Sequence, residues 1–156
     1  MLKKDARFSP CGNYRYAFWG VWDDSRPLVA FIGLNPTRVD AQRNNPTINR
    51  CIGFARAWGY GGVCLVNLFA YLATTPQELM QARDPVGPDN DAWLEEVAGT
   101  IPILVAAWGN DGTYLGRSAQ VRELIPDLQV LKLNKSGEPA HPLYLKGDLT
   151  PVPWQS

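Results

Sequence analysis

Continuous apolar runs and stretches of helical periodicity alternate along this chain. An apolar run without polar interruptions is typical of a strand that is buried on both faces of a sheet. Runs of this kind predict core strands at residues 28–33, 63–69, 102–108 and 128–133. Residues 14–22 instead alternate between polar and apolar positions and are rich in aromatic side chains. We expect this segment to form a strand that pairs with residues 28–33 in a hairpin.

Helix signals lie between the predicted strands. We expect helices at residues 45–58, from residue 75, at 92–98 before Gly99, and at 114–124, and a loop, with or without a short helix, at 137–145. Asn45 and Pro46 are a typical helix cap and first-turn residue, and Gly59 is a typical stop. Thr75 and Glu78 have the spacing of a capping box, which begins the second helix.

Buried strands that alternate with helices predict an α/β fold with a central, mostly parallel sheet. Right-handed crossovers place helices on both faces of such a sheet, which gives a three-layer sandwich. The segment at 14–22 is expected to join this sheet as an N-terminal hairpin strand. The 156 residues contain no interdomain linker, so we expect a single domain that covers residues 1–156.

Polar residues next to glycine, proline or aromatic residues follow the predicted strands. In parallel sheets, ligands bind beyond the carboxyl ends of the strands. The residues that stand there, and that we assign to one cleft, are Gly33, Asn35, Asn67, Phe69, Trp108, Asn110 and His141. The sequence therefore predicts a ligand-binding site at this edge of the sheet.

Asn35 and Asn67 are the most informative of these residues. Pro36 biases the backbone of Asn35 away from helix, and the amide is suited to position a water or a ligand, although asparagine is also common in turns. Asn67 lies inside a strand predicted to be buried, where an amide needs several hydrogen-bond partners. Either it holds neighbouring loops, or it recognises a ligand with adjacent donor and acceptor atoms, such as a nucleobase edge.

Four further residues have both a functional and a structural interpretation. His141 is the only histidine, and a lone loop histidine serves either a site or the packing of the surface. Asp40 lies in a polar loop and is a candidate general base, unless it is simply solvated. Arg50 belongs with Arg43 to a basic stretch that suits one phosphate-bearing ligand or forms a solvated surface. Trp108 is assigned to the cleft, with core packing as the alternative.

Composition and charge limit the classes of function. The formal net charge is zero, so no overall field attracts nucleic acid or anionic lipid. One histidine and three cysteines without C-x-x-C spacing do not make a zinc or iron–sulfur site, so we expect neither metal nor cofactor. No apolar run reaches membrane-spanning length, and no signal core begins the chain. We expect a cytoplasmic protein without a membrane partner, in which Cys51 and Cys64 are reduced core thiols.

Several motifs together resemble the uracil-DNA glycosylase superfamily, in its mismatch-specific branch. GLNP at 33–36 resembles the GINP motif of that branch, and NNPTINRCIGFARAWGY at 44–60 resembles its P-x-N-R-F-W helix. CLVNLF at 64–69 is similar to the strand that carries the uracil-binding asparagine of the uracil-specific branch. LVAAWGNDG at 104–112 and PAHPLYL at 139–145 resemble its L-L-W-G strand end and its H-P-S-P-L loop. The chain as a whole resembles an uncharacterised bacterial and phage family, a domain of unknown function.

The resemblance implies the fold of those glycosylases and roles for three residues. Asn35 would hold the water that attacks the sugar, Asn67 would bind the base, and His141 would stabilise negative charge on the departing base. The implied function is recognition of a nucleobase or nucleotide, with hydrolysis of an N-glycosidic bond in nucleic acid. The alternatives are a non-catalytic module that binds a nucleotide or a protein through the same cleft, and a hydrolase of another small molecule with Asp40 or His141 as base.

Overall fold

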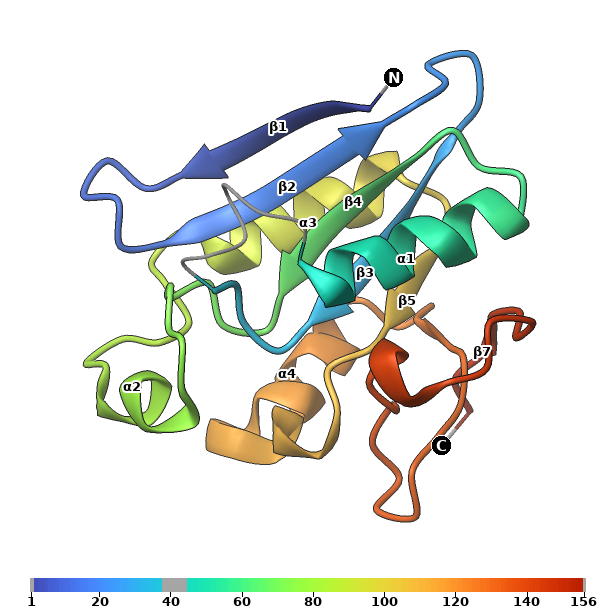
Figure 1. Ribbon diagram of the computed structural model, residues 1–156. Helices are drawn as coiled ribbons and strands as arrows, with labels where there is room; N and C mark the ends of the chain where they lie inside the picture. The colour runs from blue at the N-terminus through green and yellow to red at the C-terminus, as the bar shows by residue number, and fades with distance from the viewer. Residues whose placement is uncertain (1, 38–44, 156) are drawn as a thin grey trace.

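The computed structural model describes residues 2–37 and 45–155, which form an α/β fold around a seven-stranded mixed sheet. The strands are β1 (Lys3–Phe8), β2 (Arg15–Val21), β3 (Leu28–Gly33), β4 (Gly62–Asn67), β5 (Leu104–Ala106), β6 (Gln129–Val130) and β7 (Val152–Pro153). The helices are α1 (Pro46–Ala57), α2 (Pro76–Gln81), α3 (Asn90–Thr100) and α4 (Arg117–Leu124), with 3-10 helices η2 (Asn110–Gly116) and η3 (Pro142–Tyr144). Figure 1 shows α1 on one face of the sheet and α3 on the other.

The centre of the sheet is parallel and its margins are antiparallel. The strand order is β1-β2-β4-β3-β5-β6-β7. Parallel pairing joins β3 to β4, β3 to β5 and β5 to β6. The pairs β1–β2, β2–β4 and β6–β7 are antiparallel. The expected parallel arrangement therefore describes the strands from β4 to β6, and the sheet as a whole is mixed.

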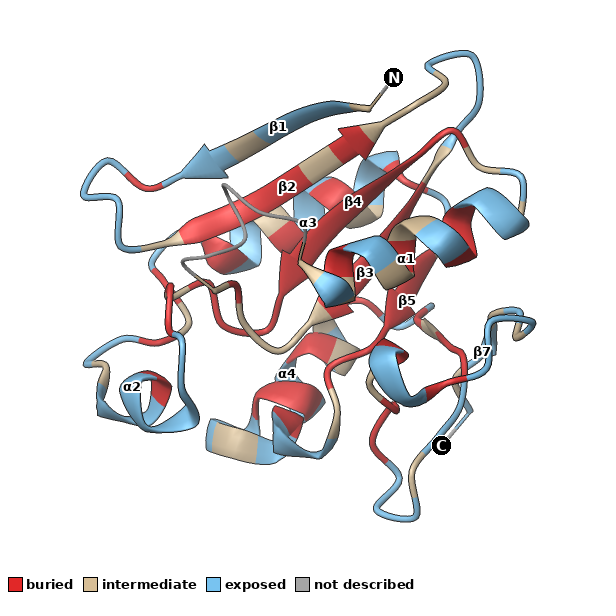
Figure 2. Cartoon of the chain, viewed as in Figure 1, coloured by how far each residue is buried: buried red, intermediate tan, exposed pale blue. Residues whose placement is uncertain are grey.

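The expected hairpin between residues 14–22 and 28–33 is wrong. In the structure β4 lies between β2 and β3, and β2 forms its hairpin with the preceding strand β1. Most of β1 is exposed, so its sequence lacks the apolar pattern by which a strand is recognised (Figure 2). β3 is apolar on both faces, because helices pack on both faces of the sheet at this strand.

Alternate side chains of β3 pack into two cores, one on each face of the sheet. The first core contains Val29 and Phe31 of β3 together with Ile48, Cys51 and Phe54 of α1. The second core contains Ala30 and Ile32 of β3 together with Leu94 and Val97 of α3 and Val121 of α4. Cys51 and Cys64 are buried free thiols, which confirms their predicted place in the core.

Local sequence signals account for the starts of two helices. Asn45 caps α1, where its Oδ1 accepts the N–H groups of Thr47 at 2.8 Å and Ile48 at 3.2 Å. Thr75 caps α2 by accepting the N–H of Glu78 at 3.2 Å. Both caps were predicted from the sequence. The α1 cap also directs the first turn of that helix toward the carboxyl edge of the sheet, where Thr47 lines a cleft.

Two predicted helices have different bounds in the structure. α3 continues beyond Gly99, so this glycine is not its stop. A glycine inside a helix costs only about 1 kcal/mol relative to alanine, and the packing of Val97 on the core can exceed this cost. Residues 114–124 do not form one helix, because the backbone leaves helical geometry at Tyr114 and Leu115. The amphipathic pattern there spans this kink, which lies inside η2, and continues into α4.

Candidate functional site

The order of the strands creates a crevice beyond the carboxyl ends of β3 and β5. The chain leaves β3 through α1 to reach β4 on one side, and it later returns to β5 on the other side. Ligands bind at such a change of direction in open α/β sheets. A cleft of about 740 Å³ opens here, lined by the ends of these strands, the first turns of α1 and the segment after β6. In Figure 1, α2, α4 and the C-terminal segment gather at this end of the sheet.

Most of the predicted site residues lie in this cleft. Its lining includes Gly33, Asn35, Asn67, Trp108, Asn110 and His141. Arg50 and Phe69 do not line it, and Asp40 and Arg43 lie outside the described residues. The residues that share the cleft come from segments far apart in the sequence, and the parallel strands bring these segments to one edge.

Asn67 presents a nearly buried side-chain amide to the cleft. It is the last residue of β4 and is 8% exposed. Its side-chain amide has no hydrogen-bond partner among the residues that the structure describes. A polar group that loses its water without gaining a partner costs about 1–3 kcal/mol. This amide therefore needs a water or a ligand as its partner. Nε1 of Trp108, which also lines the cleft, is buried and has no partner among the described residues either.

Gly33 leaves room for this amide at the end of the neighbouring strand. Gly33 and Asn67 are paired in the register of β3 and β4. A β-carbon on Gly33 would stand 2.9 Å from Oδ1 of Asn67, which is closer than real contacts of this kind. A side chain at this position would displace the amide. The absence of a side chain at Gly33 therefore allows the Asn67 amide to keep its position.

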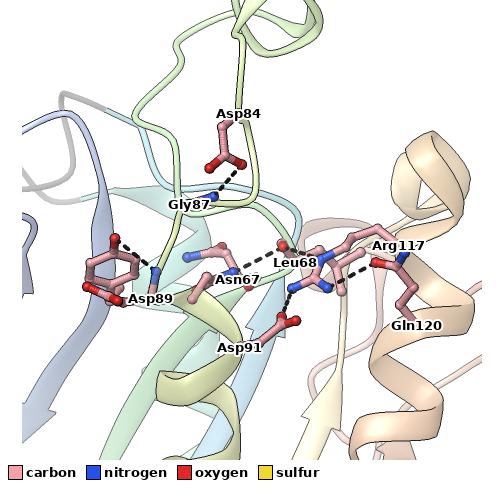
Figure 3. Close-up of polar contacts among 10 residues, drawn as sticks. Asn67, Leu68, Asp84, Gly87, Asp89, Asp91, Arg117 and Gln120 are labelled. Carbon is pink, nitrogen blue, oxygen red and sulfur yellow. Dashed lines mark hydrogen bonds and ion pairs between the residues drawn. The ribbon is translucent and has the colours of Figure 1, made fainter.

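A buried network fixes the backbone at the end of β4 (Figure 3). Asn90 Nδ2 donates to the carbonyl oxygens of Asn67 at 3.0 Å and Leu68 at 3.1 Å. Arg117 Nε donates to the same Leu68 carbonyl at 2.8 Å, and its guanidinium pairs with Asp91. Arg117 is 2% exposed, so these contacts compensate a charge that is removed from water. The network holds the backbone from which the Asn67 side chain projects.

Asn35 has a side-chain orientation that its partners determine. Its Nδ2 donates to the carbonyl oxygens of Pro36 at 2.9 Å and Ala73 at 3.0 Å. Both partners are acceptors, so the nitrogen of the amide must face them and the oxygen must face away. Among the described residues, Oδ1 of Asn35 has no partner and remains available as an acceptor. Such an oxygen can orient a water or a donor group of a ligand.

His141 contributes a neutral donor to the cleft. It caps η3, where its Nδ1 accepts the N–H of Leu143 at 3.3 Å. Burial lowers the pKa of His141 from its ordinary value of 6.5, so the imidazole is neutral at pH 7. A neutral imidazole whose Nδ1 accepts a hydrogen bond carries its proton on Nε2. The remaining Nε2–H can therefore donate to a ligand.

Arg50 binds the backbone of the loop that carries His141. Its Nε donates to the carbonyl oxygen of Pro142 at 3.4 Å, and Nη2 donates to that of Leu145. The guanidinium also lies over the ring of Phe54, 5.1 Å from its centroid. Arg50 therefore ties α1 to η3. The structure commits this side chain to backbone carbonyls rather than presenting it to the cleft as a phosphate contact.

Three other residues that were predicted to bind a ligand make mainly structural contacts within the protein. Phe69 is fully buried in the core next to α3, because the chain turns back under the sheet after Asn67. Trp108 belongs to the same core and is 1% exposed, so the core-packing alternative describes it well although it forms part of the wall. Asn110 Oδ1 accepts hydrogen bonds from Asn134 at 3.0 Å and Ser136 at 2.6 Å, which joins two loops at the rim.

Arg15 is a cleft residue that the sequence analysis missed. It is the first residue of β2, is 3% exposed and lines the cleft. Its guanidinium lies over the ring of Phe18, 5.4 Å from the centroid. The signal in the sequence was a charged residue inside an aromatic strand. Asn90 was also missed, although it stands in a turn-rich segment, and no sequence signal singles out Arg117.

The described residues provide no metal centre, because no group of three or more His, Cys, Asp or Glu side chains could hold an ion.

Burial raises the pKa of the Cys51 and Cys64 thiols to about 12, so neither is suited to act as a nucleophile at neutral pH. Within the described part of the chain, no helix has the length and apolar character needed to cross a membrane. The polar groups that line this cleft include amides, one imidazole, the buried guanidinium of Arg15 and the exposed side chains of Lys132 and Asp111.

Comparison with known proteins assigns the chain to a family without an assigned activity. Residues 15–143 match the family described as "Protein of unknown function (DUF1643)". The matched region contains Asn35, Asn67 and His141. No curated protein and no solved structure matched the chain. Because the match covers most of its length, the chain belongs to the DUF1643 family.

Proposed function

We propose that the cleft binds a nucleobase, carried by a nucleotide or a nucleic acid. The observation that carries this proposal is the side-chain amide of Asn67, which is 8% exposed and has no partner among the described residues. An amide offers a donor group and an acceptor side by side. A nucleobase edge offers the complementary pair, so one planar ligand satisfies both atoms of the amide at once.

The shape and polarity of the cleft support this class of ligand. Its volume of about 740 Å³ lies within the range of small-molecule pockets, which is about 300–1,000 Å³. Phe31 and Ile48 provide apolar lining for the faces of a base. Arg15 and Lys132 bring positive charge that suits a phosphate, and Asp111 adds one negative charge; Lys132 and Asp111 are both exposed. A base with an attached phosphate matches both parts of this lining.

Hydrolysis of an N-glycosidic bond is a second candidate function, favoured by Asn35 and His141. Oδ1 of Asn35 accepts a hydrogen bond from a water and orients its oxygen toward the sugar carbon. This oxygen bonds to the carbon, the bond from carbon to base nitrogen breaks, and the proton of the water passes to solvent. His141 Nε2–H stabilises the base that leaves with the bonding electrons.

The resemblance of several segments to the uracil-DNA glycosylases supports the same assignment. GLNP at 33–36 includes Asn35, and PAHPLYL at 139–145 includes His141. We assign the chain the fold of those glycosylases as part of this proposal. The helices on both faces of a sheet with a parallel centre support this fold assignment.

A binding screen with nucleobases, nucleosides and nucleotides, measured by isothermal titration calorimetry, tests the proposal. Asn67→Asp keeps the size of the side chain but replaces its donor by an acceptor. We expect wild-type protein to bind one class of base and the variant to bind it about tenfold more weakly or worse, because an unmatched buried pair costs about 1–3 kcal/mol. Asn49→Ala, at an exposed position of α1, is the matched control and should bind as wild type.

The alternative functions would give different results in the same screen. Binding of none of these compounds would contradict the proposal and favour a protein partner or another small molecule. Base binding without release of base from single- or double-stranded oligonucleotides would favour a binding module over a hydrolase. Equal affinity of wild type and Asn67→Asp for every base would show that Asn67 is not the recognition group.

A further inference from the structure

We infer that Tyr144 is a stacking platform for the base next to the one in the cleft, so that the ligand is a single-stranded nucleic acid. This inference rests on the proposed nucleobase site and names its substrate class. Tyr144 lines the cleft and is 85% exposed, more than any other large apolar side chain described. Aromatic side chains that bind single strands act by stacking on base faces, and this requires an accessible ring.

The ring of Tyr144 lies beside the group that we assign to the base in the cleft. Its centroid is 5.7 Å from that of His141, with 53° between the two planes. The two rings are tilted neighbours, so a ligand that reaches His141 also passes close to Tyr144. When one base approaches His141, its neighbour on the strand is therefore within reach of the Tyr144 ring.

The ring is held on a fixed support rather than on a free chain end. The N–H of Tyr144 donates to the carbonyl oxygen of His141 at 3.2 Å. His141 in turn caps the same short helix through Leu143, and Arg50 binds the carbonyl oxygen of Leu145. A fixed backbone limits the conformational entropy that is lost when a base stacks on the ring. Its exposure is thus a property of the folded loop.

The same features favour a single strand over a duplex. The faces of bases in a duplex are already stacked, whereas those in a single strand are free to meet an aromatic ring. Tight duplex binding depends on the neutralisation of many phosphates, but the formal net charge of the chain is zero. Stacking supplies affinity without additional cationic side chains.

Fluorescence anisotropy with a labelled single-stranded pentanucleotide, whose central base is the one selected in the screen, tests this inference. We expect Tyr144→Ala to bind the pentanucleotide roughly 5- to 150-fold more weakly than wild type, the range that corresponds to loss of one stacking contact. The affinity for the isolated nucleoside, measured by competition, should not change. Tyr144→Phe keeps the ring and should retain the affinity of wild type for both ligands.

A pentanucleotide with abasic sites on both sides of the central base provides the matched ligand control. Wild type and Tyr144→Ala should bind this ligand equally, because no flanking base remains to stack. If Tyr144→Ala lost the same affinity for nucleoside and pentanucleotide, or lost none for either, Tyr144 would not be a stacking platform. The proposed nucleobase site would be unaffected by that result. Tighter binding of the matched duplex would overturn the choice of a single strand. Binding of neither nucleoside nor pentanucleotide would overturn the proposed function and this inference with it.

Discussion

The oxygen of the Asn67 side chain lies so close to β3 that a β-carbon on Gly33 would stand only 2.9 Å from it. The amide of Asn35 is oriented by two carbonyl oxygens, which leaves its own oxygen as an acceptor. His141 keeps a proton on Nε2 because its Nδ1 accepts the N–H of Leu143. At the scale of residues, the cleft therefore offers one complete amide, one acceptor and one neutral donor in fixed positions.

Gly33→Ala should weaken ligand binding at a small cost in stability. The added β-carbon displaces the end of the Asn67 side chain, which can move without disturbing the backbone. We expect a loss of tenfold or more in nucleobase affinity by calorimetry, with a stability loss below about 1 kcal/mol by chemical denaturation.

Gly53→Ala is the control for Gly33→Ala, because a β-carbon on Gly53 in α1 meets open space. It should leave affinity unchanged and raise stability by about 0.4–1 kcal/mol, since alanine restricts the unfolded chain. Wild-type affinity in Gly33→Ala would show that the position of the Asn67 amide does not determine binding.

At the scale of elements, the contact between α1 and η3 positions His141. Arg50 of α1 donates to the carbonyl oxygens of Pro142 and Leu145, which lie on either side of the exposed Leu143 and Tyr144. This contact keeps the His141 loop against the sheet and so maintains the burial that lowers the pKa of the imidazole. Arg50 is thus a positioning residue, and its removal should show in the titration of His141.

The single histidine allows that titration to be followed directly by NMR of its ring protons. We expect a midpoint below 6.5 in wild type, because burial disfavours the charged ring. Arg50→Met should move the midpoint up toward 6.5 as the loop opens to water. Arg56→Met, on the same helix but over the ring of Trp22, is the control and should leave it unchanged. A wild-type midpoint at or above 6.5 would contradict the buried, neutral imidazole.

The lowered pKa of His141 also sets the direction of its effect on stability. Above pH 6.5 the ring is neutral in both the folded and the unfolded chain, and its contribution to the free energy of unfolding is complete. As the pH falls below 6.5, the unfolded chain binds a proton first, so stability decreases until the folded ring is protonated as well. Protonation also ends the acceptance of the Leu143 N–H by Nδ1, because a charged imidazole has no acceptor nitrogen.

At the scale of the whole molecule, the sequence allowed the α/β class and the parallel centre to be predicted, because strands buried on both faces are continuous apolar runs. It did not allow the sheet order to be predicted. Residues 14–22 and 28–33 are neighbours in sequence, but β4 enters between them after a crossover through α1. The edge strands β1 and β7 were missed, since both are mostly exposed and neither carries an apolar pattern.

The candidate site was predictable only in part, for a related physical reason. The rule that ligands bind beyond parallel strands placed Asn35, Asn67 and His141 in one cleft, and the structure shows all three in its lining. The rule cannot show which way the chain turns after a strand, so Phe69 was assigned to the cleft although it is fully buried. Arg15 enters the cleft from an antiparallel strand, to which the rule does not apply.

The most direct test of nucleobase recognition is the proton–nitrogen NMR spectrum of the Asn67 side-chain amide during titration with nucleosides. Asn67→Asp lacks this amide and identifies its two cross-peaks by their absence. Recognition through Asn67 predicts that one class of nucleoside shifts these peaks in a saturable manner, because Nδ2 then donates to the base. Cross-peaks that remain unchanged with every nucleoside, although the protein is folded, would contradict the claim that this buried amide recognises a nucleobase.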